Sequence, residues 1–155
     1  MNPLEKTSRS LLRNLKKSDV LVIPASSNLD KEALIDRVSK MEGVQVFDAD
    51  TIIHEDHVRF AFFHAMRSFE DGNNIARSLG LELLLRAAGT AQIEVAIQSA
   101  GVKEPKNIVI GALAKENSKT ELLKKLDATE RKWKQKDEKA LAEVIRKMVA
   151  IQLES

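Results

Sequence analysis

The stretch IARSLGLELLLRAAGTAQIEVAI, from Ile75 to Ile97, is almost entirely apolar, yet it carries Glu82, Arg86 and Gln92. Glu82 stands four residues before Arg86, so on a helix the two side chains share one face and can form an ion pair. Leucines surround this helix on most sides and leave it only a narrow polar edge. Two explanations stay open: an exposed ion pair of small energetic value, or a guanidinium held in place to receive phosphate.

The same stretch predicts two consecutive helices. Asn74 or Ser78 can cap the first helix, because their side-chain oxygens accept hydrogen bonds from free backbone N–H groups. Gly89 suits the left-handed conformation that ends a helix. We expect Thr90 to cap the second helix and Gly101 to end it in the same way as Gly89.

Strand and helix patterns alternate along the rest of the chain. Runs of β-branched residues predict strands over 19–24, which Pro24 would stop, over 44–49 and over 107–113; residues 51–53 either continue the second strand or begin another. Apolar spacing predicts helices near 4–15, over about 30–43, over 54–69, around 122–126 and from about 136 to 153. Asn28 or Asp30, and Asp137, are the expected caps of two of them. These patterns predict one α+β domain with a small, mostly antiparallel sheet packed with several helices.

Length and composition are those of a soluble globular protein. The chain has 155 residues, of which 43% are apolar and 31% are charged, enough for one domain with a sizeable core. No apolar run reaches the ~18 residues of a membrane span, and the polar N-terminus does not resemble a signal peptide. Cysteine is absent, which excludes disulfides and thiol nucleophiles. We therefore expect a cytoplasmic protein that does not associate with a membrane.

The net charge of +2 is unevenly distributed. Residues 1–17 carry five Lys or Arg and one Glu, which predicts a basic N-terminal extension before a domain at 18–155. Residues 42–56 carry five acidic side chains and no Lys or Arg, whereas residues 115–139 carry nine basic and six acidic ones. Basic segments attract phosphate, but the solvated faces of soluble proteins have the same composition.

Candidate catalytic groups gather near the start of the 54–69 helix. A metal could be ligated there by His54, His57 and the acidic residues Asp48, Asp50, Glu55 and Asp56. The pattern lacks a matching glutamate motif, however, and acids at a helix start also interact favourably with the helix dipole. Phosphate-loop, dinucleotide and hydrolase motifs are absent, as is tyrosine. The residues therefore predict a binding module with no catalytic centre, cofactor or metal; a small metal-dependent enzyme is the alternative.

The C-terminal helix has an apolar arc that looks wider than one packing contact needs. We expect one stripe of this helix to pack on the sheet and the margin of the arc to stay exposed for another protein. The arc includes Leu141, Ile145, Met148 and Val149.

Residues 78–102, SLGLELLLRAAGTAQIEVAIQSAGV, resemble the hallmark segment of the smallest core subunit of the KEOPS complex, the TPRKB family. The matching features are a serine, a glutamate four residues on, Leu-Leu-Arg, a small-small-Gly turn, then Gln-Ile and Ala-Ile. The upstream run VQVFDADTIIHEDHVRFAFFHAM, over residues 44–66, is similar to the family's strand, acidic turn and histidine-bearing helix, with His57 at the matching place. The layout agrees over about residues 19–153. The chain departs from archaeal relatives at Thr90-Ala91, where an arginine is frequent.

This resemblance implies a role, partners and site residues. KEOPS places a threonylcarbamoyl group on the adenosine beside the anticodon of tRNAs that read codons starting with A. The chain would be a non-catalytic, archaeal-type subunit that binds the atypical kinase/ATPase subunit directly, the transferase and dimerising subunits through that kinase, and tRNA by its 3′ CCA tail. The implied tRNA-binding residues are Arg77, Arg86, Gln92 and His57. The implied occupant of the C-terminal helix arc is the kinase, at Leu141, Ile145, Met148 and Val149.

Overall fold

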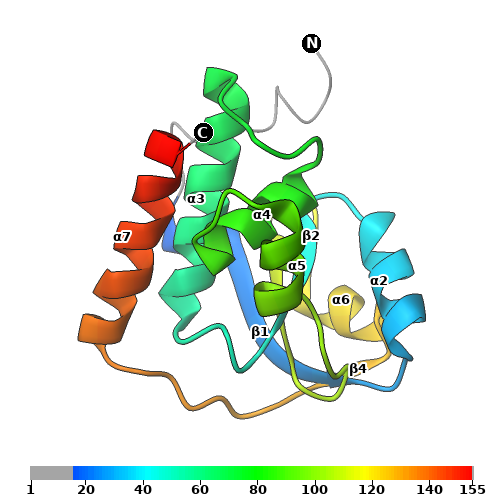
Figure 1. The fold of residues 1–155 in the computed structure, drawn as a ribbon. Helices are drawn as coiled ribbons and strands as arrows, with labels where there is room; N and C mark the ends of the chain where they lie inside the picture. Colours follow the sequence, from blue (N-terminus) through cyan, green and yellow to red (C-terminus); the bar gives the residue numbers. More distant parts are fainter. Residues whose placement is uncertain (1–15, 155) are drawn as a thin grey trace.

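Four strands form one antiparallel sheet in the computed structural model, which describes residues 16–154 (Figure 1). They are β1 (Val20–Ser27), β2 (Val44–Asp48), β3 (Ile108–Leu113) and β4 (Ala128–Glu130), and their order across the sheet is β2-β3-β1-β4. Every neighbouring pair is antiparallel, so the predicted α+β class is confirmed. β2 and β4 are the edge strands, and β3 is buried along its whole length.

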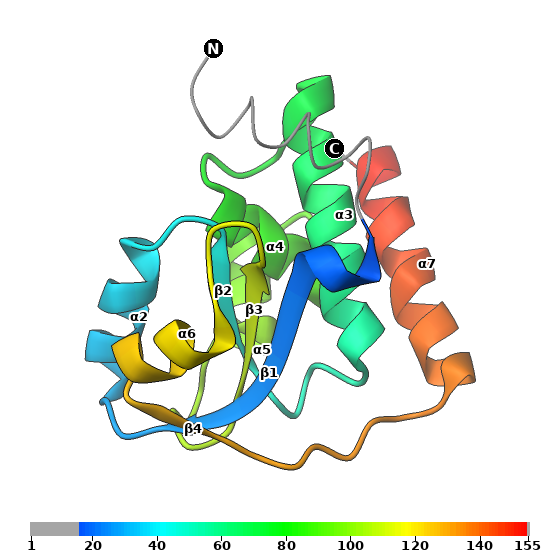
Figure 2. The same cartoon turned by 180° about the vertical axis from the view of Figure 1, so that it is seen from behind.

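Helices cover both faces of this sheet, as Figure 1 and Figure 2 show from opposite sides. One face is covered by α2 (Lys31–Ser39) and α6 (Lys119–Lys125). The other is covered by α3 (Glu55–Asp71), α4 (Leu79–Ala88), α5 (Ile93–Ala100) and α7 (Glu138–Glu154). A short 3₁₀ turn, η1 (Lys17–Asp19), leads into β1. The sheet therefore separates two apolar cores, each closed by its own set of helices.

Alternation along the strands supplies both cores. Phe47 and Val109 point toward the α3 side of the sheet, whereas Val46 and Ile110 point toward α2 and α6. The approach of α3 to β3 requires a glycine at position 111, because a Cβ atom there would lie 2.7 Å from Val58 and 2.9 Å from the ring of Phe62. Side chains of α3 thus pack directly on β3, one of the two inner strands.

The sheet differs from the prediction in three places. β1 continues past Pro24 to Ser27, because the carbonyl and the missing N–H of Pro24 face the β4 edge, so no hydrogen bond to β3 is lost. Residues 51–53 form no strand; the Thr51 and Ile52 N–H groups both donate to the Asp48 carbonyl, which turns the chain. β4 was not predicted, because its three residues carry no apolar alternation.

The helix ends agree with the prediction except at α2, which ends at Ser39 and not near residue 43, and at α5. Ser78 caps α4 by accepting from the Leu81 N–H, and Gly89 ends it with φ = 71°. Thr90 was the wrong cap, because α5 begins at Ile93 after a residue with no side-chain cap, and Gly101 has φ = −72°, not a left-handed value. The caps of α2 and α7 are confirmed at Asp30 and Asp137, which accept from Ala33 and Ala140.

Two sequence predictions fall outside the described residues. The helix expected near 4–15 and all but the end of the 1–17 extension lie before residue 16. Among residues 16–154, no helix combines the length and the apolar character needed to cross a bilayer.

Candidate functional site

The Glu82–Arg86 pair of α4 lies inside the protein, not on a polar edge. The Glu82 side chain is 0% exposed and that of Arg86 is 1% exposed, with 3.1 Å between the carboxylate and the guanidinium. The second Glu82 oxygen accepts hydrogen bonds of 2.8 Å from the N–H groups of Ile75 and Ala76, in the loop before α4. The carboxylate therefore fixes this loop as well as the arginine.

The guanidinium of Arg86 connects three helices. It donates to the Ser68 hydroxyl of α3 over 2.7 Å and to the Met148 carbonyl of α7 over 3.4 Å. The Ser68 hydroxyl in turn donates to the His64 carbonyl. Because all these partners are protein groups and the side chain has no free surface, the expectation that Arg86 contacts tRNA is corrected: in this structure it holds α3, α4 and α7 together.

His57 is buried in the same core. Its Nε2 lies 2.8 Å from the Ala87 carbonyl, and its Nδ1 accepts from the Ile53 N–H over 3.3 Å, a pattern that fits the neutral ring. Burial lowers the pKa of His57, against a smaller opposing effect of the Ala87 carbonyl. The side chain is 0% exposed, so its predicted contact with tRNA is corrected in the same way.

The acidic residues around His54 do not converge: three of them pair with cations, and Asp50 lines a separate pocket. Glu55 and Asp56 both form ion pairs with Arg59, and Asp48 accepts from Lys103 over 3.0 Å. His54 is the N-cap of α3, with its Nδ1 accepting from the Asp56 N–H. Across residues 16–154, no group of three or more His, Asp or Glu side chains could hold a metal ion. The metal-dependent alternative thus lacks the cluster that it requires.

Arg77 and Gln92 are the two predicted tRNA-binding residues that reach the surface. Arg77 lies exposed in the loop before α4, and Gln92 lies exposed just before α5. Arg77 precedes α4 and Gln92 follows it, so the two side chains lie near opposite ends of this helix. Both are accessible to a ligand.

A groove of about 770 Å³ runs along the outer edge of β2. One wall is α2 and the other is formed by α4 and the end of α5. Its exposed apolar residues include Ile35 on α2 and Ile97 on α5, each 47% exposed. At the floor, the Gln45 side chain accepts from the outward N–H of Val46 and donates to the Gly80 carbonyl. This groove, which we call the β2-edge groove, is an apolar surface built by three separate parts of the chain.

The predicted interface on α7 is divided between core and surface. Met148 is 0% exposed and Leu141 is also buried, because α7 packs on α3 and α4 and not on the sheet. These two residues are therefore corrected to core residues. Ile145 is half-buried and Val149 is 53% exposed, so only the outer margin of the arc is free for a partner.

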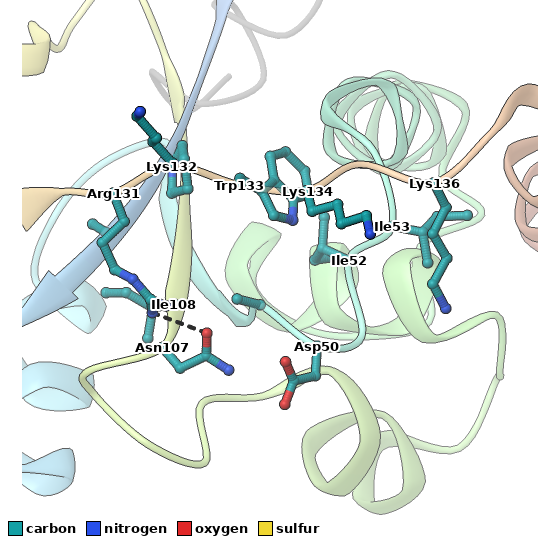
Figure 3. Close-up of a pocket in the computed structure, with 13 residues that line it drawn as sticks. Asp50, Ile52, Ile53, Asn107, Ile108, Arg131, Lys132, Trp133, Lys134 and Lys136 are labelled. Atoms are coloured by element: carbon teal, nitrogen blue, oxygen red, sulfur yellow. Dashed lines mark hydrogen bonds between the residues drawn. The ribbon is translucent and has the colours of Figure 1, made fainter.

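A second hollow, of about 260 Å³, lies beside the segment that joins β4 to α7 (Figure 3). Arg131, Lys132, Trp133, Lys134 and Lys136 line it from this segment. The opposite wall includes Asp50 and Asn107, and the figure shows Arg131 lying against Asn107. We call residues 131–136 the basic strap and the hollow beside them the strap pocket.

Comparison with protein families assigns the fold to a known group. The family model described as kinase binding protein CGI-121 matches residues 14–151, which is most of the chain. The chain belongs to the CGI-121 family. A curated relative of this family, the KEOPS complex subunit Cgi121 of Pyrococcus abyssi (strain GE5 / Orsay), is 40% identical over 57 residues. These residues are 37% of this chain and 33% of the relative, so the match spans about a third of the relative's length. The resemblance to a KEOPS kinase-binding subunit is confirmed.

Sequence reasoning missed both hollows of this CGI-121 family member. The β2-edge groove draws its walls from residues near 35, 80 and 97, which only the folded chain brings together. The strap had a visible signal, because the run RKWKQK places the sole tryptophan of the chain among four cations. The strap could have been recognised from this run, whereas the position of Asp50 and Asn107 beside it could not.

Proposed function

We propose that this chain is a non-catalytic subunit of a KEOPS complex, the assembly that makes threonylcarbamoyladenosine in tRNA. In this role it binds the atypical kinase/ATPase subunit directly, contacts the transferase and dimerising subunits through that kinase, and binds tRNA in the cytoplasm. The family's kinase-binding description and the name of the archaeal relative support this proposal. The buried positions of His57 and Arg86 agree with a structural use of the polar residues in the core.

The β2-edge groove is the observation that carries the kinase part of the proposal. Large exposed patches of apolar side chains mark protein-binding surfaces, and this groove presents Ile35 and Ile97 on facing walls. Gln45 occupies the outward hydrogen-bonding position at Val46, so a partner that added a strand to β2 would have to displace it. The groove is therefore better suited to the apolar face of a helix, anchored by a few aliphatic side chains.

Glutamate substitutions in the groove test the kinase part. Ile97→Glu and Ile35→Glu place a charge on exposed positions, so both variants should fold normally by circular dichroism. Each should weaken capture of the KEOPS kinase in a pull-down by tenfold or more, because burying an unpaired carboxylate in an interface is costly. Val149→Glu, on the exposed margin of α7, is the matched control and should bind like the wild type.

The opposite pattern would place the kinase interface outside the β2-edge groove. If Val149→Glu loses the kinase while both groove variants keep it, the kinase binds the outer margin of α7, where Ile145 and Val149 lie. If all three variants bind at full affinity, the groove is not the docking site.

The tRNA part of the proposal is tested by salt and by the tRNA tail. Affinity in a gel shift should fall as salt rises, because each phosphate contact releases bound counterions. Removal of the 3′ CCA should weaken binding more than changes in the anticodon loop. Arg77→Ala should lower affinity several-fold without lowering stability, since the side chain is exposed. A gel shift that is indifferent to the tail would contradict the tail-dependent model.

A further inference from the structure

The basic strap is an irregular segment whose backbone is fixed at both ends. At one end the Arg131 N–H donates to the Pro24 carbonyl over 2.9 Å. At the other the Lys136 N–H donates to the Ile53 carbonyl over 2.7 Å, and the Gln135 side chain accepts from the Glu55 N–H. The side chains between these anchors are therefore presented from a defined backbone, although the strap belongs to no helix or strand.

The positive charges of the strap are not neutralised by its neighbours. The Arg131 guanidinium donates to two uncharged oxygens, the Lys106 carbonyl at 2.6 Å and the Asn107 side chain at 3.0 Å. Lys132, Lys134 and Lys136 are exposed, and within residues 16–154 none of them forms an ion pair. Four cations and a single carboxylate, that of Asp50, thus line the pocket. Such a site attracts an anion.

Trp133 gives this site an aromatic surface. The indole is half-buried, packs against the α3-side core and also lines the strap pocket. Lys132 and Lys134 flank it in sequence, and Figure 3 shows Lys134 and Lys136 further along the same strap. A tryptophan held by the core and bordered by cations combines the two elements of single-stranded nucleic-acid sites: a ring for base stacking and charges for the backbone.

We propose that the strap pocket binds a nucleotide unit of single-stranded RNA, with the base against Trp133 and the adjoining phosphates on Arg131, Lys134 and Lys136. This assignment rests on the RNA-binding part of the proposed function and gives it residues that sequence reasoning did not select. Asp50 offers an acceptor to a ribose hydroxyl or a base amino group.

The size of the pocket favours a strand over an enclosed cofactor. Its volume of about 260 Å³ lies below the roughly 300–1,000 Å³ of pockets that enclose drug-sized ligands. A single unit of a longer chain fits this limit, with the neighbouring phosphates lying outside on the strap. An acidic peptide would use the cations but would gain nothing from the indole.

The sole tryptophan of the chain supplies a direct readout, because Trp133 is the only source of tryptophan fluorescence. Oligouridylate added to the full-length protein should quench this fluorescence saturably, with an affinity that falls as salt rises. Oligoglutamate, as an acidic peptide, and ATP, as a free nucleotide, should quench only weakly. Quenching by oligoglutamate as strong as by the RNA would identify an acidic-peptide site, and equal affinity for ATP would identify a free-nucleotide site; either result overturns the proposal.

Two variants separate stacking from charge, with anisotropy of a labelled oligouridylate as the measurement. Trp133→Leu keeps an apolar side chain on the core and should lower affinity by about fivefold to a hundredfold, the range expected for one lost base stack. The double variant Lys134→Ala/Lys136→Ala should make the negative slope of log affinity against log salt shallower by about 1.4, which is about 0.7 for each lost phosphate contact.

The matched control is Lys115→Ala/Lys124→Ala, which removes the same charge from exposed lysines outside the pocket. If this control weakens binding as much as the strap variant, binding follows overall charge and the strap assignment fails. If the wild type shifts tRNA and the strap variant does so equally well, the assignment fails while the proposed function stands. If oligouridylate quenches Trp133 but the wild type shifts no tRNA, the strap site stands and the tRNA part of the proposed function fails.

Discussion

Arg86 in α4 is 1% exposed and donates to a carboxylate, a hydroxyl and a carbonyl, whereas Arg131 in the basic strap is exposed and donates only to uncharged oxygens. The first arginine stands in the most apolar stretch of the chain, and the second stands in one of the most polar. A charged residue in an apolar helix suggests a binding role, but here the guanidinium of Arg86 donates its hydrogen bonds to groups inside the protein. The unremarkable polar segment is the one that leaves positive charge available to a ligand.

The largest expected effect comes from breaking the buried pair. Arg86→Ala leaves the Glu82 carboxylate buried without its cation and removes the donor to Ser68 and Met148. Loss of one partner of a buried ion pair typically costs about 3–5 kcal/mol of unfolding free energy. Urea unfolding followed by circular dichroism should show a loss of this size.

Arg146→Ala is the control for this experiment. Arg146 pairs with Glu143 on α7, and the two side chains are 73% and 61% exposed, so its removal should cost under about 1 kcal/mol. Equal and small losses for the two variants would mean that water reaches Arg86, and any loss of tRNA binding by Arg86→Ala would then report a surface role.

The next-largest effect is expected at the C-terminal end of α4, where the helix contacts α7. Gly89→Ala forces a side chain into φ = 71° and places its Cβ 2.8 Å from the Cβ of Lys147 on α7. Gly72→Ala is matched in backbone conformation, at φ = 74°, but has open space around the new methyl group. We expect about 1 kcal/mol of lost stability at position 72 and clearly more at position 89, measured by thermal and urea unfolding. Similar losses would show that α7 moves away easily and that the α4–α7 contact is loose.

A smaller effect is expected from pH, and only in the core. Burial lowers the pKa of His57 and of His64, the latter with help from the charges of Arg86 and Arg67. As pH falls below about 6.5, His57 and His64 bind protons in the unfolded chain but stay neutral in the folded core. The free energy of unfolding should therefore decrease. Urea unfolding at a series of pH values should show this decrease, and His57→Asn should reduce it.

The basic strap should not share this response, because residues 131–136 contain no histidine. Binding of oligouridylate should therefore stay constant over the range in which the free energy of unfolding changes. Binding that weakens in parallel with the stability of the wild type, and that His57→Asn makes independent of pH, would show that the core and the strap are coupled.

Among the substitutions, the smallest loss in the free energy of unfolding is expected from Arg131→Ala. The exposed guanidinium contributes two hydrogen bonds to uncharged oxygens, so its loss should cost about 1 kcal/mol or less, several-fold below the cost of Arg86→Ala. A cost comparable with that of Arg86→Ala would make the strap a structural brace and would remove the distinction between the two arginines.

Local patterns predicted most of the elements but not the depth of their side chains. The strands at 44–48 and 108–113 and the ends of α4 follow from β-branched runs, Ser78 and Gly89, which act within a few residues. The burial of Arg86 depends on Ser68 and Met148, which are 18 and 62 residues away along the chain. His57 likewise depends on the Ala87 carbonyl, 30 residues on. Sequence spacing identified the pairing of Glu82 with Arg86, but tertiary packing decided whether water could reach it.

The hydrogen bond from Arg86 to the Met148 carbonyl also orders events during synthesis of the chain. Residues 16–137 emerge from the ribosome before α7 exists, so α3 and α4 at that stage have an uncovered apolar face and a guanidinium that lacks one of its acceptors. The α3-side core can close only after residue 148 has been translated and released from the exit tunnel. Until then this apolar face stays exposed, and exposed apolar surface on an incomplete chain favours aggregation.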